Sequence, residues 1–230
     1  MTNLVFASLF LPLSHFGLSS SRLRSMLVGR VGERLFLRVY ETITLIAFAW
    51  LIVAYRGTPA HILWIAPPWL KLAILPILLS AFVLVIAGIT TPNPVIVGSA
   101  HLFDRERDET VRGILRVTRN AFFWGVGLWG LAHVVASGEL AAILMFGTIA
   151  GLGLIGAPLL DAKKEAQYGA RWDAFSELTS SLPFLAIAQG RQRLVLSEIG
   201  WWRLGLALIL FLVALYGHRW AFGASPLAGL

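Results

Sequence analysis

Residues 140–160 read LAAILMFGTIAGLGLIGAPLL and contain no charged side chain. An α-helix of about 20 apolar residues crosses the hydrocarbon core of a bilayer, so this stretch predicts a membrane-spanning helix. The whole chain has the same character, because 57% of its 230 residues are hydrophobic and only 13% are charged. A typical soluble domain has about 25% charged residues. The composition excludes a disordered chain and argues against an ordinary soluble domain.

Other apolar segments accompany this stretch. They lie at residues 3–18, 40–54, 70–89, 121–135 and 201–217. Lipid cannot satisfy free backbone N–H and C=O groups, and the alternating pattern of a membrane β-barrel does not occur in the sequence. The sequence therefore predicts an all-α, polytopic membrane protein with about six transmembrane helices in a lipid bilayer.

The positive charges support this number of helices. Of the 19 Lys and Arg residues, 16 lie in the segments 22–38, 105–119 and 163–203. These segments alternate with connections that contain few positive charges, and Lys and Arg collect in cytoplasmic loops. Both termini are therefore predicted to face away from the cytoplasm, which is the periplasm in a bacterium. The net charge of +7 reflects this topology, and nucleic acid is not expected as a partner.

The connecting segments contain two further patterns. Leu23, Leu27, Val31 and Leu35 recur every four residues with arginines between them. This amphipathic pattern predicts either a helix on an anionic membrane surface or an extension of the first spanning helix. The apolar run 182–188 is too short to cross a bilayer, and it predicts an interfacial or re-entrant segment.

The stretch 140–160 is rich in glycine. Gly147 and Gly151 are four residues apart, the small-xxx-small spacing that lets two membrane helices approach closely. We expect this pair to pack against another helix rather than to have a direct role in function.

Two histidines lie inside predicted spanning helices, His15 in the first and His133 in the fourth. Ionisable side chains are costly in lipid, so both are candidates for function. Imidazoles from two helices can occupy the two axial positions of a haem iron. Gly130, one turn before His133, leaves room for a porphyrin edge, and Trp129 on the same face can pack against the ring. The alternative is that each histidine only hydrogen-bonds across helices.

The two histidines differ in their expected depth. His15 lies about 10 Å from Arg22 along a helix, and His133 lies about 21 Å from Arg119. Both arginines are expected near the cytoplasmic surface, so pairing requires tilted helices, a tilted haem or an Arg119 outside the membrane. The chain has no cysteine, which excludes disulfides, thiolate catalysis and cysteine metal sites.

Four groups of residues resemble a known family. They are 13–18 with 30–34, 112–119, 124–133, and Tyr168-Gly169, Trp172, Thr179-Ser180 and Pro183-Phe184 within 168–184. In order and spacing they resemble NnrU proteins, a bacterial membrane family linked to denitrification, and the related plant 15-cis-zeta-carotene isomerases. The resemblance implies a single transmembrane domain over residues 1–230, in the bacterial inner membrane.

The resemblance also implies a b-type haem, which in the plant relatives is held by two histidines. His15 matches the family's histidine in the first helix, and His133 matches the one in the Leu-Ala-His piece. Two positions depart from the family pattern. Asn120-Ala121 replaces a His-Pro pair, and Gly130 replaces a cysteine of the plant isomerases. These differences weaken transfer of the isomerase activity and exclude a thiolate ligand.

These features lead to four hypotheses. The first is a membrane protein that binds b-type haem and supports nitrogen-oxide metabolism by redox chemistry, sensing or assembly, with redox or denitrification proteins as partners. The second is a haem-dependent cis–trans isomerase of a carotenoid-like polyene. The third, a membrane methyltransferase, is disfavoured because Asn120-Ala121 breaks the Arg-His-Pro piece of such enzymes. The fourth is a packing protein without a cofactor. The sequence leaves the oligomeric state open.

Overall fold

The computed structural model describes residues 1–230 except residues 20, 97, 105–109 and 229–230. Among the described residues, five helices are long and apolar enough to cross a membrane. They are α1 (Thr2–Ser19), α3 (Glu33–Arg56), α4 (Pro68–Thr90), α8 (Leu140–Tyr168) and α12 (Trp201–Phe222). A shorter apolar helix, α7 (Ala121–Ser137), accounts for the remaining predicted segment. The prediction of an all-α membrane protein is confirmed.

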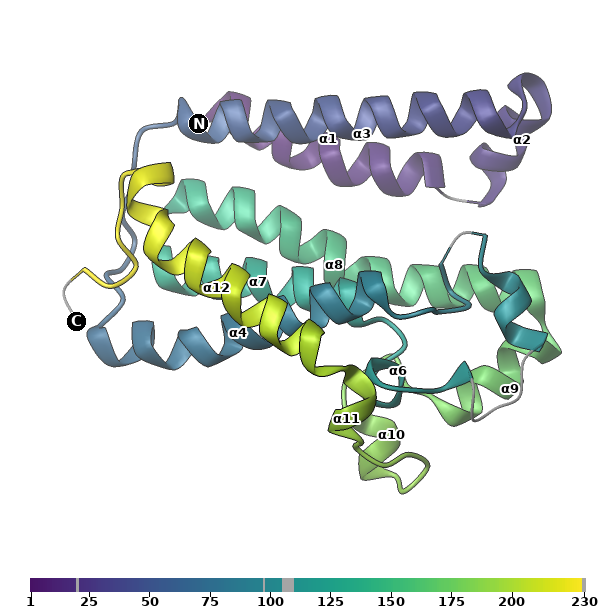
Figure 1. The fold of residues 1–230 in the computed structure, drawn as a ribbon. Coiled ribbons are helices and arrows are strands. Elements are labelled where there is room, and N and C mark those ends of the chain that lie inside the picture. The colour runs from purple at the N-terminus through teal and green to yellow at the C-terminus, as the bar shows by residue number, and fades with distance from the viewer. Residues whose placement is uncertain (20, 97, 105–109, 229–230) are drawn as a thin grey trace.

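Short helices connect the long ones. They are α2 (Ser21–Val31), η1 (Ala100–Asp104), α6 (Ile114–Val117), α9 (Ala170–Leu178), α10 (Leu185–Ala188) and α11 (Leu196–Ile199). Figure 1 shows them toward one end of the molecule, with both chain termini toward the other. We call the end with the short helices the basic end, because these connections contain most of the arginines. We call the end with the chain termini the terminal end.

The long helices form a hairpin and a bundle. In Figure 1, α1 and α3 lie side by side as an antiparallel hairpin, and both contact α8. On its other side α8 packs on α7, α7 packs on α4, and α4 packs on α12. The helix α8 therefore lies between the hairpin and the rest of the bundle.

The exposed residues of α12 match the thickness of a bilayer. Trp201 and Trp202 at its start and Trp220 near its end are exposed, and so are Ile209 and Val213 between them. Trp201 and Trp220 are separated by about 28 Å along the helix, and a hydrocarbon core is about 30 Å thick. Tryptophan gathers at both membrane interfaces, so these residues indicate the two edges of the apolar layer.

Glycines allow α7 to lie close to both of its neighbours. A Cβ atom on Gly130 would lie 2.7 Å from the Phe146 carbonyl oxygen of α8. A Cβ atom on Gly125 would lie 2.8 Å from the Ala81 carbonyl oxygen of α4. Both distances are too short for any side chain, and small residues permit such backbone contacts in membranes. The position of α7 between α4 and α8 therefore depends on its glycines.

The predicted role of Gly147 and Gly151 is wrong. A Cβ atom on Gly147 would meet no atom within 4 Å, and one on Gly151 would meet only Ile155 of the same helix, at 4.0 Å. Two other glycines of α8 pack closely on α7: a Cβ atom on Gly153 would lie 2.5 Å from the Phe123 carbonyl oxygen, and one on Gly156 would lie 2.6 Å from the Phe123 ring. The spacing of two glycines does not show which face of a helix meets a neighbour.

The amphipathic segment forms a helix of its own. The helix α2 ends at Val31, and α3 begins at Glu33 after Gly32, whose φ of 79° lies in the left-handed region that glycine tolerates. Arg24 of α2 donates to the Glu33 carboxylate at 2.8 Å. Figure 1 shows α2 turned away from the direction of α1, so the segment is not a straight extension of the first helix.

A buried ion pair joins the basic end of α7 to α8. The Arg119 guanidinium donates to Asp161 Oδ2 from Nε at 2.9 Å and from Nη2 at 2.6 Å, and both side chains are mostly buried. Asn120 donates from Nδ2 to Asp161 Oδ1 at 2.8 Å. The Trp124 indole donates to the Ser181 carbonyl at 2.7 Å, which attaches the chain around residue 181 to the same end of α7.

The apolar run 182–188 also lies at the basic end. The Phe184 N–H donates to the Val117 carbonyl at 2.8 Å, and Ala186 is buried while Leu182 is exposed. Figure 1 shows α10 outside the bundle of long helices. This position agrees with an interfacial segment and not with a re-entrant one.

A second ion pair attaches α11 to α6. Arg116 donates from Nε to Glu198 Oε2 at 2.7 Å and from Nη2 to Oε1 at 3.1 Å, and the Gly113 N–H donates to Oε2 at 2.9 Å. The bonds from Arg116, assisted by the Gly113 N–H, hold the pKa of Glu198 below its ordinary value of 4.5, against an opposing effect of burial.

Gly153 and Gly147 provide a matched pair for testing the α7–α8 contact. We expect Gly153→Ala to destabilise the protein by about 1–3 kcal/mol, because its methyl group meets the backbone of α7. Gly147→Ala should be neutral or stabilising by up to about 1 kcal/mol, because alanine favours the helix. Thermal unfolding in detergent measures both variants. Equal unfolding temperatures would contradict the described packing.

The Arg116–Glu198 pair predicts a pH-dependent stability. A carboxylate with a lowered pKa stabilises the fold fully above its unfolded-state pKa, and this contribution is lost as the pH falls through the folded-state pKa. We expect Glu198→Gln to cost about 1.5–3 kcal/mol near neutral pH, as for a hydrogen bond to a charged group. The difference from wild type in thermal unfolding should shrink below pH about 4.5. A difference that is the same at every pH would argue against the ion pair.

Candidate functional site

His133 lies in α7 among aromatic side chains. Its ring centroid is 4.2 Å from the ring of Trp129 and 4.7 Å from the ring of Phe146 of α8. Its Nδ1 lies 2.8 Å from the Trp129 carbonyl oxygen. Because a carbonyl oxygen only accepts, Nδ1 is assigned the proton and donates. His133 is therefore held by its own helix and by packing on α8.

His15 lies in the half of α1 nearer to the basic end and faces α3. The Tyr40 hydroxyl is 2.9 Å from His15 Nδ1, and the two ring centroids are 5.4 Å apart. His15 also contacts Phe16 edge-on, with 5.6 Å between the ring centroids. This is the hydrogen bond across helices that the sequence left open as the alternative to metal binding.

The structure does not bring His15 and His133 together. The Thr148 hydroxyl lies 3.3 Å from the Ser8 carbonyl oxygen. Gly130 contacts the same turn of α8 from the opposite side. Ser8, Thr148 and Gly130 therefore lie at about the same depth along the bundle. His15 follows Ser8 by about 10.5 Å toward the basic end, and His133 follows Gly130 by about 4.5 Å toward the terminal end. The two imidazoles therefore differ in depth by about 15 Å.

The space predicted for a porphyrin beside Gly130 is filled by protein. The close approach of α8 described above leaves no room for a Cβ atom there, since the Ala150 nitrogen would also lie at 2.8 Å. Trp129 packs on Phe146, with ring centroids 5.3 Å apart. In this arrangement His15, His133, Gly130 and Trp129 do not fit a single bis-histidine haem, because one iron atom must bond both imidazoles.

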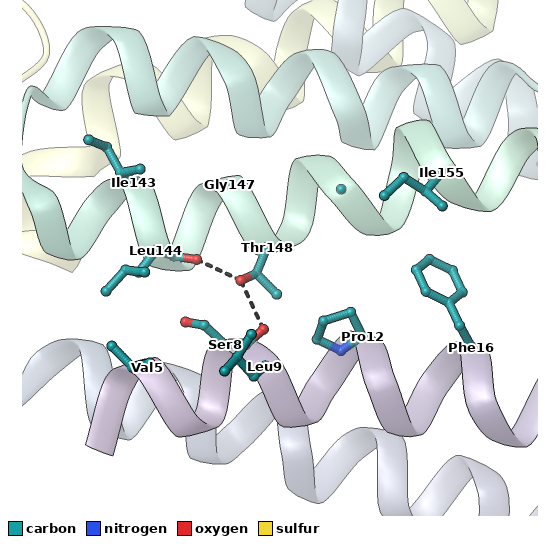
Figure 2. Close-up of a pocket in the computed structure, with 11 residues that line it drawn as sticks. Val5, Ser8, Leu9, Pro12, Phe16, Ile143, Leu144, Gly147, Thr148 and Ile155 are labelled. Atoms are coloured by element: carbon teal, nitrogen blue, oxygen red, sulfur yellow. Dashed lines mark hydrogen bonds between the residues drawn. The ribbon is translucent and has the colours of Figure 1, made fainter. Parts of the chain in front are cut away.

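A groove runs between α1 and α8, on a different face of α8 from the one that contacts α7. Figure 2 shows Leu9, Pro12 and Phe16 of α1 opposite Ile143, Gly147 and Ile155 of α8. The cavity has a volume of about 360 Å³. Its lining extends from Val5 to Phe16, about 16 Å along α1. Leu9 and Ile155 are exposed, so the groove opens toward the lipid.

Two hydroxyl groups lie in this apolar groove. Thr148 Oγ1 donates to the Leu144 carbonyl at 2.6 Å and makes its longer contact with the Ser8 carbonyl (Figure 2). The side chain of Ser8 is buried, and its Oγ has no hydrogen-bond partner within the described part of the chain. The surface of the groove is therefore apolar, and the unpaired Ser8 Oγ beside it is covered by protein.

The sequence contains only weak signals for this groove. They are Ser8 and Thr148 in otherwise apolar helices, and the glycines Gly147 and Gly151, whose spacing is typical of helix packing. Of the predicted site residues, His15 lies nearest to the groove, since it contacts Phe16 at the groove's basic end. His133 packs on the opposite side of α8.

Part of this chain is similar to two plant enzymes. It is 34% identical over 82 residues to the chloroplastic 15-cis-zeta-carotene isomerase of Zea mays, which is 36% of this chain and 22% of that protein. It is 38% identical over 81 residues to the enzyme of the same name from Arabidopsis thaliana, again 22% of that protein. The matched region therefore covers less than a quarter of each relative. No solved structure matches this chain.

The family match is more extensive than the match to either relative. A family model described as NnrU protein matches residues 3–226. This range includes all the long helices, both histidines and both sides of the groove between α1 and α8. This protein therefore belongs to the NnrU family.

Proposed function

We propose that this protein binds an extended apolar molecule from the bilayer in the groove between α1 and α8, and that it isomerises a carbon–carbon double bond of that molecule. The observation that supports this proposal is the groove itself. Pockets for small molecules have volumes of about 300–1,000 Å³ and mostly apolar linings, and the cavity of about 360 Å³ is of this kind. Its opening toward lipid gives a hydrophobic substrate a direct entry.

We assign the substrate to the polyenes because the plant relatives are named as isomerases of a carotene. A cis–trans isomerisation forms and breaks no σ-bond, and substrate and product have the same atoms and electrons. The groove residues bind the chain and exclude water. A straight apolar groove of about 16 Å favours a straight chain over a bent one, so it would favour the trans product.

We also propose that the protein lies in the inner membrane of a bacterium. The basic end faces the cytoplasm, because Lys and Arg collect on that side of a membrane, and both termini then lie on the periplasmic side of a bacterial inner membrane. Redox or denitrification partner proteins would meet the basic end, where the connections lie.

The second candidate function is the haem-dependent role in nitrogen-oxide metabolism, and it stays a prediction. Family membership supports it, because the NnrU resemblance is what suggested denitrification and b-type haem. The separation of His15 and His133 by about 15 Å in depth does not support a haem held by both.

Filling the groove tests the first proposal. A Leu side chain at Gly151 starts in the groove, because Gly151 lines it and the atom nearest to a Cβ there is in its own helix. In vesicles containing 15-cis-zeta-carotene, we expect wild-type protein to convert the cis isomer. Gly151→Leu should slow conversion about tenfold or more, because the substrate loses its reacting position. Isomers are separated chromatographically.

Gly205→Leu on α12 is the matched control, because a Cβ atom there also meets nothing within 4 Å. It should keep wild-type activity, and both variants should keep the wild-type unfolding temperature. Absence of conversion by the wild-type protein, or equal rates for both variants, would refute the proposed function.

Absorption spectra test the second candidate. A bis-histidine haem predicts sharp bands in the reduced protein that disappear in both His15→Ala and His133→Ala. From the arrangement described above we expect no bands of this kind in purified protein supplied with haem. Low-spin bands that both substitutions abolish would establish the haem site, and α1 would then have to shift relative to α7.

A further inference from the structure

A second apolar pocket lies at the basic end, where α1, α2 and α3 come together. We call it the hairpin pocket. Its lining includes Leu18 of α1, Leu27 and Val31 of α2, and Leu35, Val39 and Tyr40 of α3. Its volume is about 180 Å³, which is below the roughly 300 Å³ of the smallest common small-molecule sites. The hairpin pocket therefore has the size to hold part of a ligand and not to enclose a whole one.

The hairpin pocket lies at the edge of the apolar layer. Arg56 ends α3 on the side of the terminal end. Leu35 lies about 31.5 Å from Arg56 along the helix, and Tyr40 lies about 24 Å from it. A hydrocarbon core is about 30 Å thick. Val31, Leu35 and Val39 are about half exposed, so the pocket offers an apolar surface at the depth where the chains of a phospholipid join its headgroup.

An arginine comes directly before each of these three exposed residues. The arginines are Arg30, Arg34 and Arg38. They are exposed, and none of them forms an ion pair within the part of the chain that the structure describes. Residues four apart lie on the same face of a helix, so Arg34 and Arg38 form one basic row on α3. This row lies next to the row of Leu35 and Val39 that borders the hairpin pocket.

The charges around the hairpin pocket are mostly positive. Residues 22–41 contain five arginines and two glutamates. Glu33 is already paired with Arg24 at 2.8 Å, and Glu41 is exposed. Lys163 of α8 is exposed and interacts electrostatically with both members of the Arg24–Glu33 pair, so a third helix adds positive charge to the same region. An anionic group would compensate this charge, whereas a cationic group would be repelled.

We propose that the hairpin pocket binds an anionic phospholipid from the leaflet at the basic end. Part of one acyl chain lies in the pocket, and the phosphate group is held by Arg34 and Arg38. Guanidinium groups bind phosphate oxygens through paired N–H donors. The depth of the pocket favours a lipid over a soluble acidic protein. This site is separate from the groove between α1 and α8, and the inference goes beyond the proposed function without depending on it.

Two phospholipids with the same chains test the site. Palmitoyl-oleoyl phosphatidylglycerol is anionic, and the corresponding phosphatidylcholine is zwitterionic. Each is titrated into purified full-length protein in detergent, and native mass spectrometry counts the lipids bound to each protein molecule. We expect one phosphatidylglycerol to bind about 25-fold more tightly than phosphatidylcholine, a factor of about five for each of Arg34 and Arg38. Equal binding of the two lipids would overturn the inference.

Matched double variants assign this preference to the basic row. Arg34→Gln with Arg38→Gln should remove most of the preference for phosphatidylglycerol. Arg171→Gln with Arg193→Gln is the control, because it removes the same charge from exposed positions in other connections at the basic end, and it should keep the preference. An equal loss in both double variants would show that net charge alone attracts the lipid, and the inference would then be wrong.

Two exposed valines of α3 test whether a chain lies in the pocket. Val39 lines the hairpin pocket, and Val53 lies near the terminal end of the same helix. Val39→Trp should weaken binding of both phospholipids about fivefold or more, because an acyl chain loses apolar contact, whereas Val53→Trp should not. Both variants should keep the wild-type unfolding temperature, which excludes a loss of fold as the cause.

Three further outcomes would refute a seated phospholipid. The first is unchanged lipid binding by Val39→Trp. The second is displacement of phosphatidylglycerol by glycerophosphoglycerol, which has the headgroup but no chains. The third is a dimer that excludes the lipid, because a second copy of the protein would then cover the pocket.

Discussion

The close contact of α7 with α4 and α8 is the constraint on which the other helices depend. Gly125 and Gly130 let backbone meet backbone on two sides of α7, and the Arg119–Asp161 pair fixes its basic end to α8. In lipid no hydrophobic force draws helices together, so close packing and buried polar contacts must do so. With α7 fixed on one face of α8, the hairpin of α1 and α3 can meet only another face.

That second face of α8 explains the groove. Gly147 and Gly151 line the groove and leave space on the α1 side of α8. The hairpin packs on α8 beside the groove through a shared apolar cluster that includes Leu4, Leu51 and Ala141. The same geometry separates the two histidines, since His133 belongs to the tightly packed side and His15 to the hairpin. One helix thus divides the protein into a compact bundle and a more open side.

The sequence predicted the all-α membrane fold well, because charge and apolar length have direct physical consequences in a bilayer. Its site residues stay a prediction. Buried ionisable groups are costly in lipid, which favours His15 and His133, and the structure gives each imidazole one partner, the Tyr40 hydroxyl and the Trp129 carbonyl. The spacing of Gly147 and Gly151 predicts helix packing, but both line the groove. One hydroxyl in an apolar helix is ordinary, so the sequence gives no sign that Ser8 borders a groove.

What the sequence alone determined is where helices lie and which of their ends are basic, since each depends on a local run of residues. Apolar stretches such as 140–160 must be helical in lipid, and 16 of 19 positive charges mark one end. Only the tertiary structure decided which glycines meet backbone, which border open space, and that Ser8 Oγ has no hydrogen-bond partner within the described residues. These properties depend on the rotation and depth of one helix against another, which are set by contacts between residues far apart in the chain.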